Sequence, residues 1–130
     1  RVLLMAIEVG DEFFSHKRVA DEDVKLFADI SGDHNPLHLD TEFASKTVFK
    51  QRIVHGMLTA SLISAALASL PGTIILVHLC LSFEKPVYVG DNLVAKVTVR
   101  RIENSNIYLD AEVASGENRV LSGSARIIRR

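Results

Sequence analysis

The segment Met57–Leu70 constrains the fold of this chain more than any other feature of its sequence. Its apolar side chains would cover nearly every side of a helix, interrupted only by Thr59 and three serines. A helix that is apolar almost all round is typical of a protein core. The segment is also shorter than the roughly 20 residues that a membrane-spanning helix needs. We therefore expect a buried core helix, with no membrane partner.

Most of the remaining chain is predicted to form antiparallel strands. Ile74–Phe83 is a continuous apolar run, consistent with a strand buried on both faces. Apolar and other side chains alternate over Leu93–Val99 and Ile107–Val113, and a last strand covers Arg119–Ile128. A meander of this kind needs a cover for one face of its sheet, and the Met57–Leu70 helix can supply it. We predict an α+β fold with one domain over residues 1–130.

The first third of the chain should contain a strand, helices and a polar loop. A strand is expected around Phe13–Val19, and a helix capped by Asp21 should carry an apolar stripe through Ile30 and end at Gly32. Because Pro36 disfavours helical geometry at the residue before it, we expect residues 33–39 to be irregular. Asp40 or Thr41 then resembles the cap of a short helix.

Composition excludes some classes of partner. The 130 residues are 48% hydrophobic and 24% charged, with a net charge of −1. No overall field therefore attracts nucleic acid or an anionic membrane, and we expect neither as a partner. Lys46, Lys50 and Arg52 could form a local patch for an anionic ligand, or could simply be a solvated face.

The cysteine content and the start of the chain bear on the compartment. The single cysteine, Cys80, lies in an apolar run, which favours a buried structural thiol and excludes a disulfide within the chain. The apolar start, residues 1–7, is too short for a secretory leader. These features fit a reducing compartment, and we expect the cytoplasm, or the mitochondrial matrix if the source is a eukaryote.

Candidate chemistry is concentrated between Ser31 and Asp40. Asp33 and His38 lie five positions apart across a loop that Pro36 stiffens, and Asn35 can hold the turn by local hydrogen bonds. A carboxylate and an imidazole so arranged can hold one water between two proton-transfer groups. The alternative is a hydrogen bond from Asp to His that merely stabilises the loop.

A metal site is a further alternative for the same region. Its ligands would come from Asp33, His34, His38, Asp40 and His55. These side chains are suitable ligands, but the sequence has no cysteine partner near them and no HExxH-type spacing. We therefore expect neither a metal nor another cofactor.

Gly56 is the second candidate for chemistry, because it opens the long apolar helix. The first N–H groups of a helix have no partner within it, and its dipole favours negative charge there. A glycine leaves these donors uncovered by a side chain, as an oxyanion hole requires. The alternative is an ordinary loop glycine.

These stretches together resemble a known family. Gly32-Asp33-His34-Asn35-Pro36-Leu37-His38-Leu39-Asp40, followed by Ile53-Val54-His55-Gly56-Met57, is similar to the MaoC-like (R)-specific enoyl-CoA hydratases. The resemblance extends through Leu81-Ser82-Phe83 and Val89-Gly90-Asp91 to the last strand. One departure is Leu79-Cys80, where the family often has Gln-Ser, and it affects the polarity of the acyl pocket.

The resemblance implies a fold, an assembly and roles for individual residues. The fold would be the hot-dog fold, an antiparallel sheet wrapped around one helix, and the protein would be a homodimer. Asp33 and His38 would be the catalytic pair, and the Gly56 N–H would bind the thioester oxygen. Ser64 would lie in the active site, and we predict that it binds substrate together with Asn35 and His55.

The implied reaction is the reversible hydration of trans-2-enoyl-CoA to (R)-3-hydroxyacyl-CoA, catalysed by a hydro-lyase. An acyl-carrier-protein thioester is a close variant, because only the carrier differs. Two alternatives use the same fold: an acyl-CoA thioesterase and a non-catalytic subunit that binds acyl thioesters. The pairing of His38 with Asp33 argues against both.

Overall fold

The computed structural model describes residues 6–130. Residues 1–5, which belong to the apolar start judged too short for a secretory leader, lie outside it. In chain order the elements are β1 (Glu12–Arg18), α1 (Asp21–Ser31), α2 (Pro36–Leu39), α3 (Thr41–Ser45), α4 (Gly56–Ala68), β2 (Ile74–Phe83), β3 (Asn92–Glu103), β4 (Asn106–Ser115) and β5 (Asn118–Arg129).

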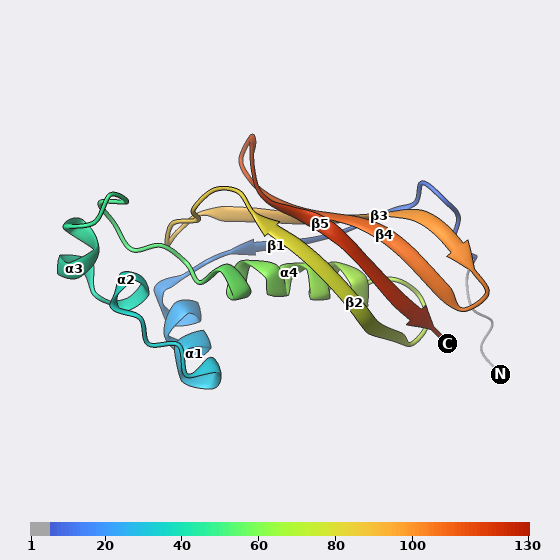
Figure 1. The fold of residues 1–130 in the computed structure, drawn as a ribbon, viewed down its shortest axis with the longest axis horizontal. Coiled ribbons are helices and arrows are strands. Elements are labelled where there is room, and N and C mark those ends of the chain that lie inside the picture. Colours follow the sequence, from blue (N-terminus) through green and yellow to red (C-terminus); the bar gives the residue numbers. More distant parts are fainter. Residues whose placement is uncertain (1–5) are drawn as a thin grey trace.

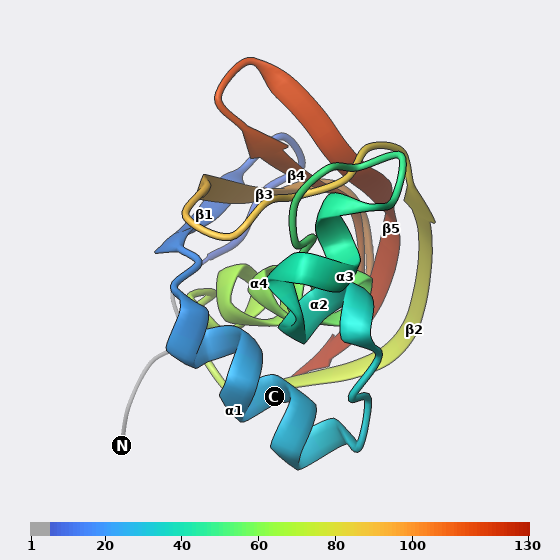
Figure 2. The same ribbon diagram turned by 90° about the vertical axis from the view of Figure 1, so that its left-hand side faces the viewer.

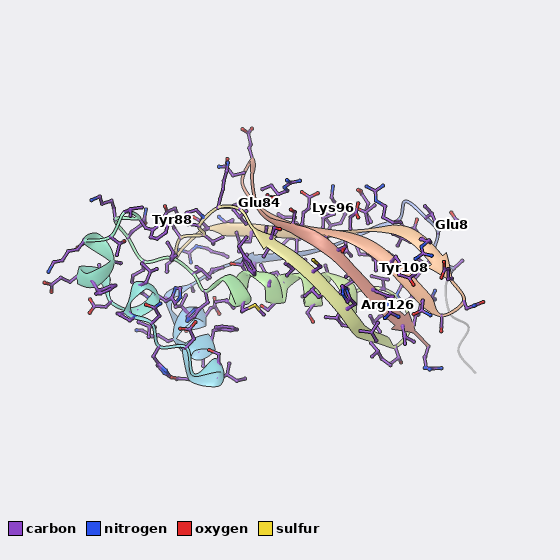
Figure 3. All side chains as sticks on the ribbon, in the orientation of Figure 1. Glu8, Glu84, Tyr88, Lys96, Tyr108 and Arg126 are labelled. Atoms are coloured by element: carbon purple, nitrogen blue, oxygen red, sulfur yellow. The ribbon has the colours of Figure 1, made fainter. Side chains whose placement is uncertain are left out.

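The five strands form one antiparallel sheet in the order β1-β3-β4-β5-β2. This sheet curves around α4, as the view along the helix shows (Figure 2). The three short helices gather at the end of the sheet where α4 begins (Figure 1). The predicted α+β class and the hot-dog architecture are therefore confirmed.

The core forms where the inner face of the sheet meets α4. The predicted alternation on β3 and β4 is confirmed, since Leu93, Val97 and Leu109 are at most 1% exposed. From α4, Ile63 and Leu67 pack into the same cluster. An alternating strand buries one face only, so a single helix on that face is enough to complete the core.

Two predictions of complete burial are wrong for the single chain. One side of α4 is exposed, along a stripe formed by Met57, Ser61, Ser64, Ala65 and Ala68. Strand β2 is an edge strand whose residues are exposed or half-buried, Cys80 among the exposed ones. The apolar composition was correctly recognised, but within this chain only one side of α4 and one edge of β2 are covered.

The polar loop contains more helix than predicted. Pro36 occupies the first position of α2, where its missing N–H costs no hydrogen bond, so residues 36–39 complete one helical turn. Asp40 caps α3, as predicted, by accepting a hydrogen bond from the Phe43 N–H. Gly32 ends α1 with a φ of 79°, the left-handed geometry that favours glycine.

The start of α1 also differs from the prediction in detail. Its N-cap is Ala20 rather than Asp21, and the Asp23 carboxylate accepts a hydrogen bond from the Ala20 N–H. At the other end of the helix, Ile30 is 86% exposed and so lies outside the predicted apolar stripe. Among the helices of residues 6–130, none is long and apolar enough to cross a membrane.

Candidate active site

Asp33 lies on a short loop that local hydrogen bonds keep in shape. Its backbone N–H donates to the Ser31 hydroxyl (3.1 Å), and its carboxylate accepts from the Asn35 N–H (3.2 Å). The Asn35 side chain accepts in turn from the Leu37 N–H (3.1 Å), capping α2. The predicted turn-holding role of Asn35 is confirmed, whereas its contact with substrate stays a prediction.

The side chain of His38 is held in one tautomer. Its Nδ1 lies 2.7 Å from the backbone carbonyl oxygen of Ile53. A carbonyl can only accept, so Nδ1 carries the hydrogen and, in the neutral ring, Nε2 carries the lone pair. The described residues provide no partner for Nε2, which can therefore take a proton from water.

Arg52 anchors the backbone of His38. Its Nε donates to the His38 carbonyl oxygen at 2.7 Å, and its Nη1 lies 2.6 Å from an Asp21 carboxylate oxygen on α1. Hydrogen bonds from Lys25 and Arg52 lower the pKa of Asp21. Arg52 thus links α1 with α2, and Lys46 pairs with Glu42 on α3. Two of the three cations considered for an anion patch therefore already have an acidic partner.

The structure brings His55 to the other two predicted residues. A carboxylate oxygen of Asp33 and one ring nitrogen each of His38 and His55 all lie within 4.8 Å of one another. The His38 and His55 rings stack with centroids 4.0 Å apart and planes at 31°. A separation of this size between Asp33 and His38 allows one water to hydrogen-bond to both, as acid–base catalysis requires.

The same cluster contains three of the five residues considered as metal ligands. The other two are elsewhere: His34 lies 3.4 Å from Asp29 on the surface, and Asp40 caps α3. The ligand atoms of the remaining three lie close enough together to hold a metal ion. The expectation that no metal is bound therefore stays a prediction.

Gly56 is the first residue of α4 and opens into a cavity of about 330 Å³. The cavity is lined mostly by apolar side chains, with His38 and Gly56 in its wall. The first α4 residue to donate within the helix is Leu58, to the His55 carbonyl; the described part of the chain offers no acceptor for the Gly56 N–H. This N–H is available to a carbonyl oxygen bound in the cavity.

Ser64 is not part of this cavity wall. It lies on the exposed stripe of α4, eight positions beyond Gly56 and so roughly 12 Å along the helix. Within one chain it is therefore separated from Asp33 and His38. Its predicted place in the active site stays a prediction.

The contacts that were not predicted from the sequence include the Ile53 carbonyl on His38, the Arg52 anchor, and Phe83 beside Gly56. A Cβ atom on Gly56 would lie 3.0 Å from the Phe83 ring, which belongs to the end of β2. Ile53 is the first residue of the recognised stretch Ile53–Met57 and Arg52 directly precedes it, and this proximity was the only available signal. Phe83 is far from Gly56 in sequence, so no local pattern indicated their contact.

The fold and the site together define a class: a hot-dog protein whose carboxylate–imidazole pair lies beside the open N-terminus of the central helix. Comparison with known proteins narrows this class. The sequence model of the family described as "MaoC like domain" matches residues 7–118. The chain belongs to this MaoC-like family.

Named relatives agree with this membership. The chain is 39% identical to a 3-hydroxybutyryl-CoA dehydratase of Methylorubrum extorquens, over 93% of the chain and 80% of the relative. It is 48% identical to an (R)-specific enoyl-CoA hydratase of Aeromonas caviae, over 72% of each. The solved structure of the A. caviae (R)-hydratase superposes with a TM-score of 0.92 at 36% identity, covering 96% of this chain and 98% of that one.

Proposed function

We propose that this protein is a hydro-lyase that reversibly adds water to trans-2-enoyl-CoA to form (R)-3-hydroxyacyl-CoA. The observation that carries the proposal is the Asp33–His38 pair beside the cavity that Gly56 opens; within the described residues, Nε2 of His38 has no partner. The names of the relatives in M. extorquens and A. caviae support the same reaction.

The reaction assigns a task to each group. The Asp33–His38 pair holds one water and removes a proton from it as the oxygen bonds to the β-carbon of the substrate. Negative charge moves to the thioester oxygen, where the Gly56 N–H and the α4 dipole stabilise it. The pair then delivers a proton to the α-carbon, so water is added overall and the pair returns to its starting state. The two residues share the protons as a unit.

The carrier and the compartment belong to the same proposal. An acyl-carrier-protein thioester presents the same reacting atoms as acyl-CoA, and we include it as a substrate in which the enzyme acts as a dehydratase. We place the protein in a reducing compartment, the cytoplasm or the mitochondrial matrix. The single cysteine, Cys80, is free and has no disulfide partner within the chain, which fits such a compartment.

One assay tests the function against its alternatives. With crotonyl-CoA, we expect the enoyl absorbance to fall to an equilibrium value without release of free thiol. Thiol release at the same rate would indicate a thioesterase, and no change in either signal would indicate a non-catalytic binding subunit. Chelators should leave the rate unchanged; activity lost to a chelator and restored by zinc would replace the acid–base interpretation with a metal site.

We also propose that the protein is a homodimer joined along β2. The two edges of the sheet differ: β1 exposes Glu12, Lys17 and Arg18, whereas β2 carries no Asp, Glu, Lys or Arg. Charged side chains commonly protect an edge strand from pairing. The apolar residue Val77 is 40% exposed on β2, and the uncovered stripe of α4 adds to the surface that a second copy would bury.

A single charge on β2 should disrupt this dimer. We expect light scattering to give the parent protein twice its chain mass of 14.3 kDa, and Val77→Lys to shift it toward the single-chain mass. Burying an unpaired lysine at an interface is unfavourable. His16→Lys, a change at an exposed residue of β1, is the matched control and should remain dimeric. A parent protein that is a stable monomer at working concentration would contradict the proposal.

A further inference from the structure

His55 has a buried ring that the proton transfers do not use. The residue is 2% exposed, and its Nε2 lies 3.0 Å from the backbone carbonyl oxygen of Asp33. Because that carbonyl can only accept, Nε2 carries the hydrogen and donates it. Nδ1 is left as a buried lone pair without a partner among the described residues.

The ring of His55 also supports the ring of His38. The centroids of the His55 and His38 rings are 4.0 Å apart, and the Phe27 ring of α1 makes a tilted contact with His55 at 4.9 Å. Burial lowers the pKa of His55, and the hydrogen bond to the Asp33 carbonyl offsets this only in part. The ring is therefore neutral at pH 7 and places no charge beside His38.

His55 is the N-cap residue of α4 and directly precedes Gly56. N-cap residues commonly accept a hydrogen bond from the first N–H groups of their helix. The His55 side chain makes no such bond and is turned toward Asp33 instead. The α4 terminus, which begins at Gly56, is thus left without a side-chain cap, while His55 holds the loop that carries the Asp33 carboxylate.

We propose that His55 is a positioning residue that sets the distance between the Asp33 carboxylate and His38, rather than a residue that binds substrate. The proposal rests on the proposed hydratase function. Asp33 itself is exposed, and its loop meets the buried part of the site through the carbonyl that His55 holds. Catalytic groups must be kept within a fraction of an ångström of their productive positions, so this bond controls the rate.

Two substitutions at His55 distinguish the effect of its hydrogen bond to Asp33 from the effect of its ring. His55→Phe keeps a stacked ring of similar size but removes the donor; His55→Gln removes the ring but can keep an N–H near the Nε2 position. We expect His55→Phe to lower kcat about tenfold to hundredfold with KM within a factor of about three. His55→Gln should recover most of that loss.

A control variant and a spectrum keep the test decisive. Ile63→Val truncates an equally buried α4 side chain outside the site and should lower the melting temperature without lowering kcat. In the parent protein at pH 7, the nitrogen NMR spectrum of His55 should show Nε2 protonated and Nδ1 unprotonated, which reports the bond even if either variant fails to fold.

Several outcomes would overturn the proposal. These are a folded His55→Phe protein with the parent kcat, equal losses in folded His55→Phe and His55→Gln, or a spectrum with Nδ1 protonated. Failure of the function itself would look different. In that case the parent protein would not hydrate crotonyl-CoA although the His55 spectrum matched expectation.

Discussion

Asp33→Asn and His38→Gln should each lower kcat for crotonyl-CoA hydration by about 10²–10⁴-fold, the usual contribution of a positioned acid or base. Asn cannot take up or release the proton that the Asp33 carboxylate handles, and Gln has no basic nitrogen in place of Nε2 of His38. Substrate binding should change little, because both groups act on the water. Steady-state kinetics of the purified variants would measure kcat and KM separately.

The double variant and a neighbouring histidine provide controls. Because both residues act on one water, the Asp33→Asn/His38→Gln protein should lose less than the product of the two single losses. His34→Ala should be far milder, since His34 is exposed and lies next to Asp29 rather than the cavity. A folded Asp33→Asn protein that hydrates crotonyl-CoA at near the parent rate would refute the catalytic assignment.

Gly56→Val should lower kcat by about 10²–10³-fold, the loss that follows removal of one oxyanion donor. A Cβ at this position already lies 3.0 Å from the Phe83 ring, so a branched side chain must displace that ring and cover the N–H of the helix. Measurement of kcat alongside the far-ultraviolet circular dichroism spectrum would distinguish this loss from unfolding.

A second substitution distinguishes two causes of the loss: valine covering the Gly56 N–H, and valine crowding the Phe83 ring. In Gly56→Val/Phe83→Leu, the smaller side chain removes much of the contact with Phe83 but leaves valine over the donor. We expect the double variant to remain impaired. Full recovery of turnover would assign the loss to crowding by Phe83, and full turnover in folded Gly56→Val alone would remove the oxyanion role.

Much of the fold was predictable because its pattern is local. The alternation on β3 and β4 indicated which face is buried, and Gly32 marked the end of α1. One failure was the turn of helix at Pro36, where the rule that proline disfavours helix does not apply to a first helical position. Another was the complete burial expected of α4 and β2, because apolar composition does not reveal what covers a surface.

The candidate site was predictable in its members but not in its geometry. Asp33, His38 and Gly56 were recognised by residue type and by resemblance to a family. Their protonation and orientation depend on partners that no local pattern connects with them. The Ile53 carbonyl sets the tautomer of His38 from 15 positions away, and His55 holds the Asp33 loop from 22 positions away.

The sequence by itself therefore determined most element types and the core-facing residues of β3 and β4, which follow from periodicity acting over a few residues. It also selected Asp33 and His38 as the proposed acid–base pair, through residue type and resemblance to a family. The tertiary structure alone decided that, among residues 6–130, Nε2 of His38 has no partner and one side of α4 and of β2 is left uncovered. It also decided that the His55 side chain is turned toward Asp33. Hydrogen bonds and burial of this kind exist only once distant segments are brought together in space.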